Sequence, residues 1–193
     1  CTTAYADYIS AYPNKPEGYM QRGTFYAAKN NLELANTNFS IAIEKSNAND
    51  TTSITTDAIH NSISRIIYNK IMEQGKDSTL SNGWTLSRAE EEAEKAYAIH
   101  PYTLYLVQRG NCLYAEKKYK QAFDCFKKAC DDKQFVSSET FFSAARSLEL
   151  SQGDAKEVIT LLDSCIARIP SQNKARYAQF YFERSQRLVK AKE

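Results

Sequence analysis

Two stretches of eight residues have the same pattern of large and small side chains: residues 19–26, Tyr-Met-Gln-Arg-Gly-Thr-Phe-Tyr, and residues 106–113, Leu-Val-Gln-Arg-Gly-Asn-Cys-Leu. In both, an alanine follows 12 residues after the glycine, and a second alanine follows 7 residues after the first. The small residues at these spacings are Gly23, Ala35, Ala42, Gly110, Ala122 and Ala129. Two antiparallel helices cross closely only where side chains are small and large side chains fill the space between. The spacing therefore predicts a helical hairpin at each stretch.

The prolines indicate that the hairpin recurs along the chain. Pro101 and Pro170 both follow apolar segments that favour helix, and they lie 69 residues apart, close to two periods of 34. Pro13 and Pro101 lie 88 residues apart, which is two such periods and an insertion of about 20 residues. A fixed period of this length is typical of proteins built from helical repeats.

Together with Phe39 and Phe126, the two stretches and their alanines resemble the motif of the tetratricopeptide family. That motif runs aromatic, Leu-Gly, Tyr, Ala, aromatic, Ala and Pro across about 34 residues. Both stretches depart from it in one place, because Arg22 and Arg109 stand where the family has Leu. The resemblance implies an all-α fold, a right-handed superhelical solenoid of stacked antiparallel helical hairpins, with about four to five partial or complete repeats.

We expect a single solenoid over residues 1–193, with repeats of uneven quality. Its parts are the second helix of a truncated repeat (1–15), a repeat (16–49), a divergent repeat with an insertion (50–102), two repeats (103–136 and 137–172) and a terminal helix (173–193). Two interpretations of these ends stay open. The chain is a fragment of a longer repeat protein, or its last helix caps the solenoid and shields the final apolar face.

The insertion is expected to form a long helix near residues 54–74 and then a loop over 75–86. Ser87 and Glu90 have the spacing of a capping box, so they predict the start of the next helix. Asp154 is expected to cap a later helix in the same way.

Charge and hydropathy argue against several classes of partner. The chain has 25 basic and 23 acidic residues, a formal net charge of +2, and the two signs are interspersed. A protein that binds nucleic acid usually concentrates its basic residues in a stripe. No apolar run is long enough to cross a bilayer. We therefore predict no nucleic-acid partner and no transmembrane segment.

The cysteines leave the compartment open. There are five, an odd number, and no pair has CxxC spacing, so we expect no disulfide framework. Cys1 stands where a mature bacterial lipoprotein carries its lipid, but helix-like sequence follows almost at once, so we expect no lipid anchor there. The repeats resemble those of bacterial envelope-associated tetratricopeptide proteins. Cell envelope, periplasm and cytoplasm all remain possible locations.

The sequence gives no sign of catalysis. His60 and His100 lie 40 residues apart, and neither belongs to an HExxH motif or to a cluster with metal-ligand spacing. The phosphate-binding motifs GxxxxGK[ST] and GxGxxG and the nucleophile motif GxSxG are all absent. We therefore predict a non-enzyme with no catalytic residues, no metal site and no cofactor. Aromatic side chains offer one alternative, a small-molecule or glycan site using Trp84, Tyr114 or Phe142.

A partner is expected in the concave groove, because stacked hairpins curve and the first helix of each hairpin lines the concave face. The residues predicted to point into it, hereafter the groove residues, are Met20, Thr24, Arg65, Asn69, Val107, Asn111, Phe142, Arg146, Phe182 and Gln186. An apolar line rimmed with amides suits a peptide or helix of another protein. The alternative is that these side chains pack against a neighbouring repeat. Some tetratricopeptide domains hold a terminal carboxylate with a basic clamp, which is missing here.

We therefore expect a non-catalytic protein–protein interaction scaffold. A second hypothesis is a self-assembling structural module, because both ends carry an incomplete hairpin that a second copy could complete.

Overall fold

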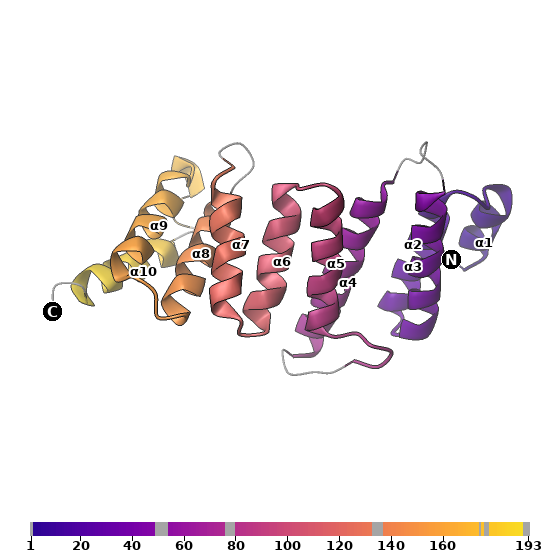
Figure 1. Ribbon diagram of the computed structural model, residues 1–193, viewed down its shortest axis with the longest axis horizontal. Helices are drawn as coiled ribbons and strands as arrows, with labels where there is room; N and C mark the ends of the chain where they lie inside the picture. Colours follow the sequence, from indigo (N-terminus) through magenta and orange to yellow (C-terminus); the bar gives the residue numbers. More distant parts are fainter. Residues whose placement is uncertain are drawn as a thin grey trace. The chain divides into compact units, whose positions relative to one another are not determined.

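The structure is a computed structural model, and it describes residues 2–48, 54–75, 80–132, 137–173, 175 and 178–190. Within these residues it contains ten α-helices, one short 3-10 helix and no strand (Figure 1). The predicted all-α class is confirmed.

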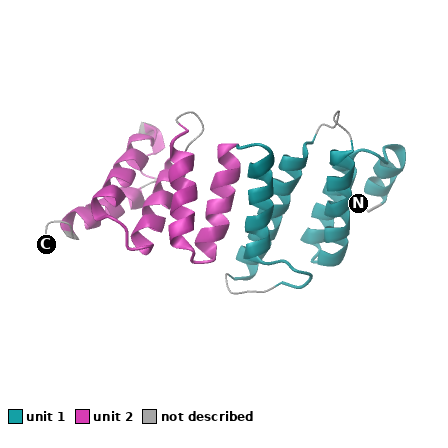
Figure 2. Ribbon diagram, in the orientation of Figure 1, with its two compact units in different colours: residues 1–101 teal, residues 102–193 magenta. Residues whose placement is uncertain are grey.

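The chain divides into two compact units, residues 1–101 and 102–193 (Figure 2). The helices of the first unit are α1 (Thr2–Ala11), α2 (Pro16–Ala28), α3 (Leu32–Asn47), α4 (Thr56–Gln74) and α5 (Leu86–Ile99). Those of the second are α6 (Thr103–Ala115), α7 (Tyr119–Cys130), α8 (Ser138–Leu150), α9 (Ala155–Ala167), η1 (Ser171–Asn173) and α10 (Ala178–Lys190). Residues 50–53 and 191–193, which lie in the expected divergent repeat and terminal helix, are outside the described residues.

Consecutive helices form hairpins within each unit. In the first unit α2 pairs with α3 and α4 with α5, while α1 packs on α2. In the second unit α6 pairs with α7 and α8 with α9, and α10 packs on α9. We call α2, α4, α6, α8 and α10 the first helices, because each occupies the place of the first helix of a hairpin.

The predicted close crossings are present. A Cβ atom built on Gly23 would lie 2.6 Å from Cδ1 of Phe39, and one built on Gly110 would lie 2.7 Å from Cε1 of Phe126. The four alanines of the motif are almost completely buried: Ala35, Ala42, Ala122 and Ala129. Each glycine therefore makes the space that the phenylalanine ring of the opposite helix fills.

Three hairpins share one turn geometry. Asn30, Lys117 and Gln152 all have a positive φ, between 60° and 62°. In each turn the next residue donates its backbone N–H to a carbonyl five residues earlier, as Asn31 does to Tyr26 at 2.9 Å. This pattern ends a helix with a Schellman motif, which satisfies its last carbonyl groups. The hairpins therefore repeat the same turn conformation as well as the same helix packing.

The segment that leads into α5 is anchored on α3 by Trp84. Its indole is fully buried and stacks on Phe39, with ring centroids 6.4 Å apart. The indole Nε1–H donates to Oδ1 of Asn36 at 2.8 Å, and Nδ2 of Asn36 donates to the carbonyl of Asn82 at 3.0 Å. The end of the insertion therefore belongs to the core of the first unit.

One of the two predicted helix starts is wrong. The N-cap of α5 is Thr85, whose side chain accepts from the backbone N–H of Arg88, so Ser87 already lies inside the helix. The prediction for Asp154 is confirmed, since its carboxylate accepts from the backbone N–H groups of Lys156 and Glu157.

We predict that Gly110→Ala destabilises the second unit by about 1–2 kcal/mol. The added methyl overlaps the ring of Phe126, which is 1% exposed, so the ring must shift within the packed core, and this outweighs the better helix propensity of alanine. Urea unfolding followed by circular dichroism measures the change.

The control is the same substitution in a Phe126→Leu background, where the smaller side chain leaves space. There Gly110→Ala should cost about 1 kcal/mol less, which a double-mutant cycle reports as coupling. An identical cost in both backgrounds would refute the crossing as its cause.

Candidate functional site

The groove residues of the first unit do not form an apolar line. Met20 is 5% exposed, so the expectation that it presents an apolar surface is wrong. Thr24 is half-buried, and its hydroxyl donates to the carbonyl of Met20 at 2.9 Å. Arg65 and Asn69 are exposed one helical turn apart on α4. The exposed groove residues of this unit are therefore polar.

In the second unit, three groove residues are engaged in packing. Val107 and Phe142 are half-buried against the hydrophobic core of this unit. The ring of Phe142 stacks on that of Phe180, with centroids 4.2 Å apart. The guanidinium of Arg146 pairs with Glu149 at 3.3 Å and with Glu183 on α10 at 3.6 Å. Phe142 and Arg146 therefore pack against the neighbouring helix α10, which is the alternative to a position in an open groove.

The remaining groove residues of this unit are more accessible. Phe182 is 62% exposed, and Gln186 is exposed one turn further along α10. Asn111 on α6 is half-buried. The structure thus leaves an aromatic ring and an amide side by side on the surface of α10.

The orientation of α10 is fixed by charged side chains. Arg187 donates to Glu149 of α8 at 2.7 Å and pairs with Glu183 on its own helix at 2.5 Å. Arg184 forms an ion pair with Asp163 of α9. These contacts, together with the stacked rings, hold one side of α10 against α8 and α9, so that Phe182 faces away from them.

A polar pair inside the first unit was missed by the sequence reasoning. Nδ1 of His60 on α4 lies 2.6 Å from Oε2 of Glu92 on α5, and Nζ of Lys95 lies 2.8 Å from the other oxygen. Glu92 is 6% exposed. Burial alone would raise the pKa of its carboxyl, but the hydrogen bonds from His60 and Lys95 outweigh it, and the pKa lies below its ordinary value.

The second histidine also meets a carboxylate between the same helices. Nδ1 of His100 lies 3.1 Å from Oδ1 of Asp57, which is 2% exposed. Both histidines thus join α4 to α5 through buried acids. Both histidines are therefore structural residues. In the sequence, these pairs could have been found only by looking for an acid on the opposite helix of the hairpin at the level of each histidine.

Comparison with solved structures identifies the architecture. A thermophilic TPR protein of Thermus thermophilus aligns with 97% of this chain and 88% of its own, at 16% identity and a TM-score of 0.58. The fold is that of the tetratricopeptide-repeat proteins. Yeast Tom70 aligns with 97% of this chain at 13% identity and a TM-score of 0.51, and the match spans 43% of the Tom70 chain. No family model and no curated protein sequence matches the chain.

The aromatic residues considered for a glycan site serve the tetratricopeptide packing instead. Trp84 is fully buried, Phe142 stacks on Phe180, and Tyr114 packs edge-on against Tyr119, with centroids 5.4 Å apart. The expectation that Trp84 is available to a ligand is therefore wrong.

Two of the cysteines are held in the thiol form. Burial raises the pKa of Cys130 and of Cys165 to about 12, so both remain protonated at neutral pH. In the part of the chain that the structure describes, no group of three or more His, Cys, Asp and Glu side chains is placed to hold a metal ion. Over the same residues, no helix is both long and apolar enough to cross a membrane.

We predict that Glu92→Gln lowers the free energy of unfolding of the first unit at pH 7 by about 1–3 kcal/mol, because it removes a buried charged hydrogen-bond acceptor. The pKa of Glu92 is lowered on folding, so the stabilisation is complete above the ordinary value of 4.5 and is lost as the pH falls below it. The difference between wild type and variant should therefore shrink in acid. Fluorescence of Trp84, the single tryptophan, reports urea unfolding of this unit.

Glu91→Gln is the matched control, since Glu91 is an exposed neighbour on the same helix. It should change stability by no more than about 0.5 kcal/mol. A wild-type–Glu92→Gln difference that stays constant from neutral pH into acid would contradict the assignment.

Proposed function

We propose that this chain is a non-catalytic scaffold that binds a peptide or helix of another protein on the exposed faces of its first helices. The observation that carries the proposal is the surface of α10, where Phe182 is 62% exposed although ring stacking and ion pairs hold the other side of the helix on α8 and α9. A large exposed aromatic side chain on a helix that is packed on its other side is a typical anchor for a partner.

The polar groove residues support the same interpretation. Gln186 beside Phe182, and Arg65 beside Asn69 on α4, offer hydrogen-bond donors and acceptors one helical turn apart. Such pairs suit the backbone groups of an extended peptide or the polar flank of a helix. All four side chains lie on first helices, and in a tetratricopeptide solenoid the first helices line the concave surface.

The arrangement favours binding over catalysis. The two histidines are engaged with buried carboxylates, and Cys130 and Cys165 are held as protonated thiols. These side chains contribute to the packing of the helices, and none of them provides the nucleophile-and-base geometry that an enzyme needs.

Self-assembly remains a second candidate because Val189, 60% exposed, lies on the same face of α10 as Phe182. An apolar stripe of this kind could pair with a second copy of the chain. Light scattering coupled to size-exclusion chromatography distinguishes self-assembly from binding of another protein. Self-assembly gives a molar mass that rises with concentration, and Phe182→Glu should remove this dependence.

We predict that Phe182→Glu weakens capture of the partner from native lysate at least tenfold, because it places a charge where an aromatic ring was covered. The double variant Arg65→Glu/Asn69→Glu should also weaken capture of the partner, because both residues are exposed on α4 of the first unit. Quantitative mass spectrometry of the retained proteins gives the ratio to wild type.

Leu34→Glu is the matched control. Leu34 is 39% exposed on α3, a second helix, and the substitution places an acid in the first turn of that helix, where it is tolerated. Its capture should equal that of wild type. Loss with Leu34→Glu and retention with Phe182→Glu would move the binding surface to the second helices and refute the proposal.

A further inference from the structure

Each first helix of the second unit carries a stripe of three residues, which we call its outer stripe. The members lie four and then three residues apart, so that they share one face of the helix. They are Val107, Asn111 and Tyr114 on α6, Phe142, Arg146 and Glu149 on α8, and Phe182, Gln186 and Val189 on α10. On every helix a small residue follows the first member three places later, namely Gly110, Ala145 or Ser185. The three stripes therefore occupy the same place in the repeat.

Helix α10 covers the outer stripe of α8 with three matched side chains. The pairs are Phe180 with Phe142, whose ring centroids are 4.2 Å apart, Glu183 with Arg146 at 3.6 Å, and Arg187 with Glu149 at 2.7 Å. The covering residues follow one another at intervals of three and four places, and they lie on another face of α10 than its own outer stripe. The structure thus shows how one helix recognises an outer stripe.

Burial separates the stripe of α10 from the two before it. Every member of the outer stripes of α6 and α8 is half-buried. On α10, Phe182 is 62% exposed, Val189 is 60% exposed, and Gln186 is exposed as well. Large apolar side chains exposed on one stripe of a packed helix mark a contact surface. In the described part of the second unit, the outer stripe of α10 is therefore the exposed one of the three.

The residues of this stripe determine what a covering helix must carry. Phe182 keeps the aromatic ring of the equivalent position on α8, so it offers a ring for stacking. Gln186 stands in the place of Arg146, and Val189 in the place of Glu149, so both charged positions have become neutral. A carboxylate and a guanidinium facing them would lose water without meeting an opposite charge. An uncharged polar side chain suits Gln186, and an apolar one suits Val189.

We propose that the outer stripe of α10 binds an α-helix of another protein, which carries an aromatic residue, an uncharged polar residue three places later and an apolar residue four places after that. This helix docks on α10 in the way that α10 docks on α8, with its aromatic ring on Phe182. The inference rests on the proposed function and specifies the partner's element and its three contacting side chains.

Two peptides derived from α10 test this pattern. Both have the sequence of residues 178–190 and are held helical by a side-chain staple placed away from the three covering residues. The charged peptide keeps Glu183 and Arg187, and the neutral peptide carries Glu183→Gln and Arg187→Leu. Fluorescence anisotropy of each labelled peptide with the full chain measures the affinity. The neutral peptide should bind saturably and at least tenfold more tightly than the charged one. No binding of the neutral peptide, or equal binding of both, would overturn the proposal.

A variant that gives α10 the outer stripe of α8 should reverse this preference. In Gln186→Arg/Val189→Glu, Glu183 and Arg187 of the charged peptide meet opposite charges, as they do on α8. The charged peptide should then bind at least tenfold more tightly than the neutral one. A preference that stays with the neutral peptide would refute the register on which the pattern rests.

The matched control places the same two substituents on second helices. Gln121→Arg/Thr160→Glu adds an arginine on α7 and a glutamate on α9, both at exposed positions. It should leave the preference for the neutral peptide unchanged. Circular dichroism establishes that both double variants are folded.

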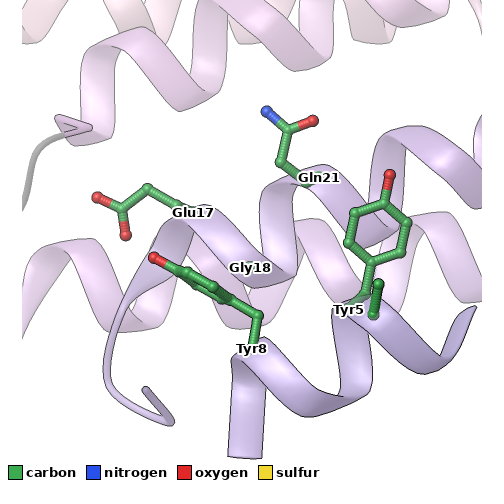
Figure 3. Close-up of a pocket in the computed structure, with 6 residues that line it drawn as sticks. Tyr5, Tyr8, Glu17, Gly18 and Gln21 are labelled. Carbon is green, nitrogen blue, oxygen red and sulfur yellow. The ribbon is translucent and has the colours of Figure 1, made fainter. Parts of the chain in front are cut away.

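The first unit offers another apolar place to which a peptide could bind. It is a pocket of about 380 Å³ between α1 and α2, and Figure 3 shows the side chains of Tyr5 and Tyr8 bordering it. NMR separates the two places. The neutral peptide should shift the resonances of Phe182 and Gln186 and leave those of both tyrosines unchanged. Shifts at the tyrosines without shifts on α10 would overturn the proposal.

Failure of this inference is distinguishable from failure of the proposed function. If neither peptide binds but Phe182→Glu still weakens capture of a partner, the helix pattern is refuted and the scaffold stands. If the peptides bind with the expected preference and reversal but Phe182→Glu captures as wild type does, the stripe recognises helices and the proposed function fails. A molar mass of the chain alone that rises with concentration, and that the neutral peptide lowers, would assign the stripe to a second copy and overturn the choice of another protein.

Discussion

The close contact between a glycine and a phenylalanine on opposite helices fixes the packing of two hairpins, α2–α3 and α6–α7. Gly23 meets Phe39, and Gly110 meets Phe126, at distances that leave no space for a β-carbon. Because the ring occupies that space, the two helices pack with their alanines fully buried, and the crossing sets which faces remain outside. For α2 and α6, this packing sets which positions of the helix remain exposed.

Much of the fold could be predicted because the motif is local. The glycine and its two alanines lie within 20 residues of each other, and their spacing alone identifies a hairpin. The start of α5 was harder. Thr85 and Ser87 are both acceptable N-caps, and Thr85 follows directly on Trp84, which is hydrogen-bonded to Asn36 of α3. That contact spans 48 residues, so no local pattern contains it.

The site was less predictable for a related reason. Helical periodicity tells which side chains share a face, but it does not tell which of them a later helix covers. Met20 was assigned to the surface and is buried, and Phe142 was assigned to the groove and lies under Phe180, from a helix that follows much later in the chain. Phe182 stayed exposed because the ion pairs of Arg187 and Arg184 turn the other side of α10 inward.

Hydrogen exchange of the chain, alone and bound to its captured partner, shows which helices the partner covers. Backbone amides are shielded where a partner covers a helix, and mass spectrometry locates the change along the chain. We expect new protection in first helices, above all in α10 around Phe182 and in α4 around Asn69, with α3, α7 and α9 unchanged. Protection confined to those second helices would refute binding on the first helices, because it would place the partner on the opposite faces of the hairpins.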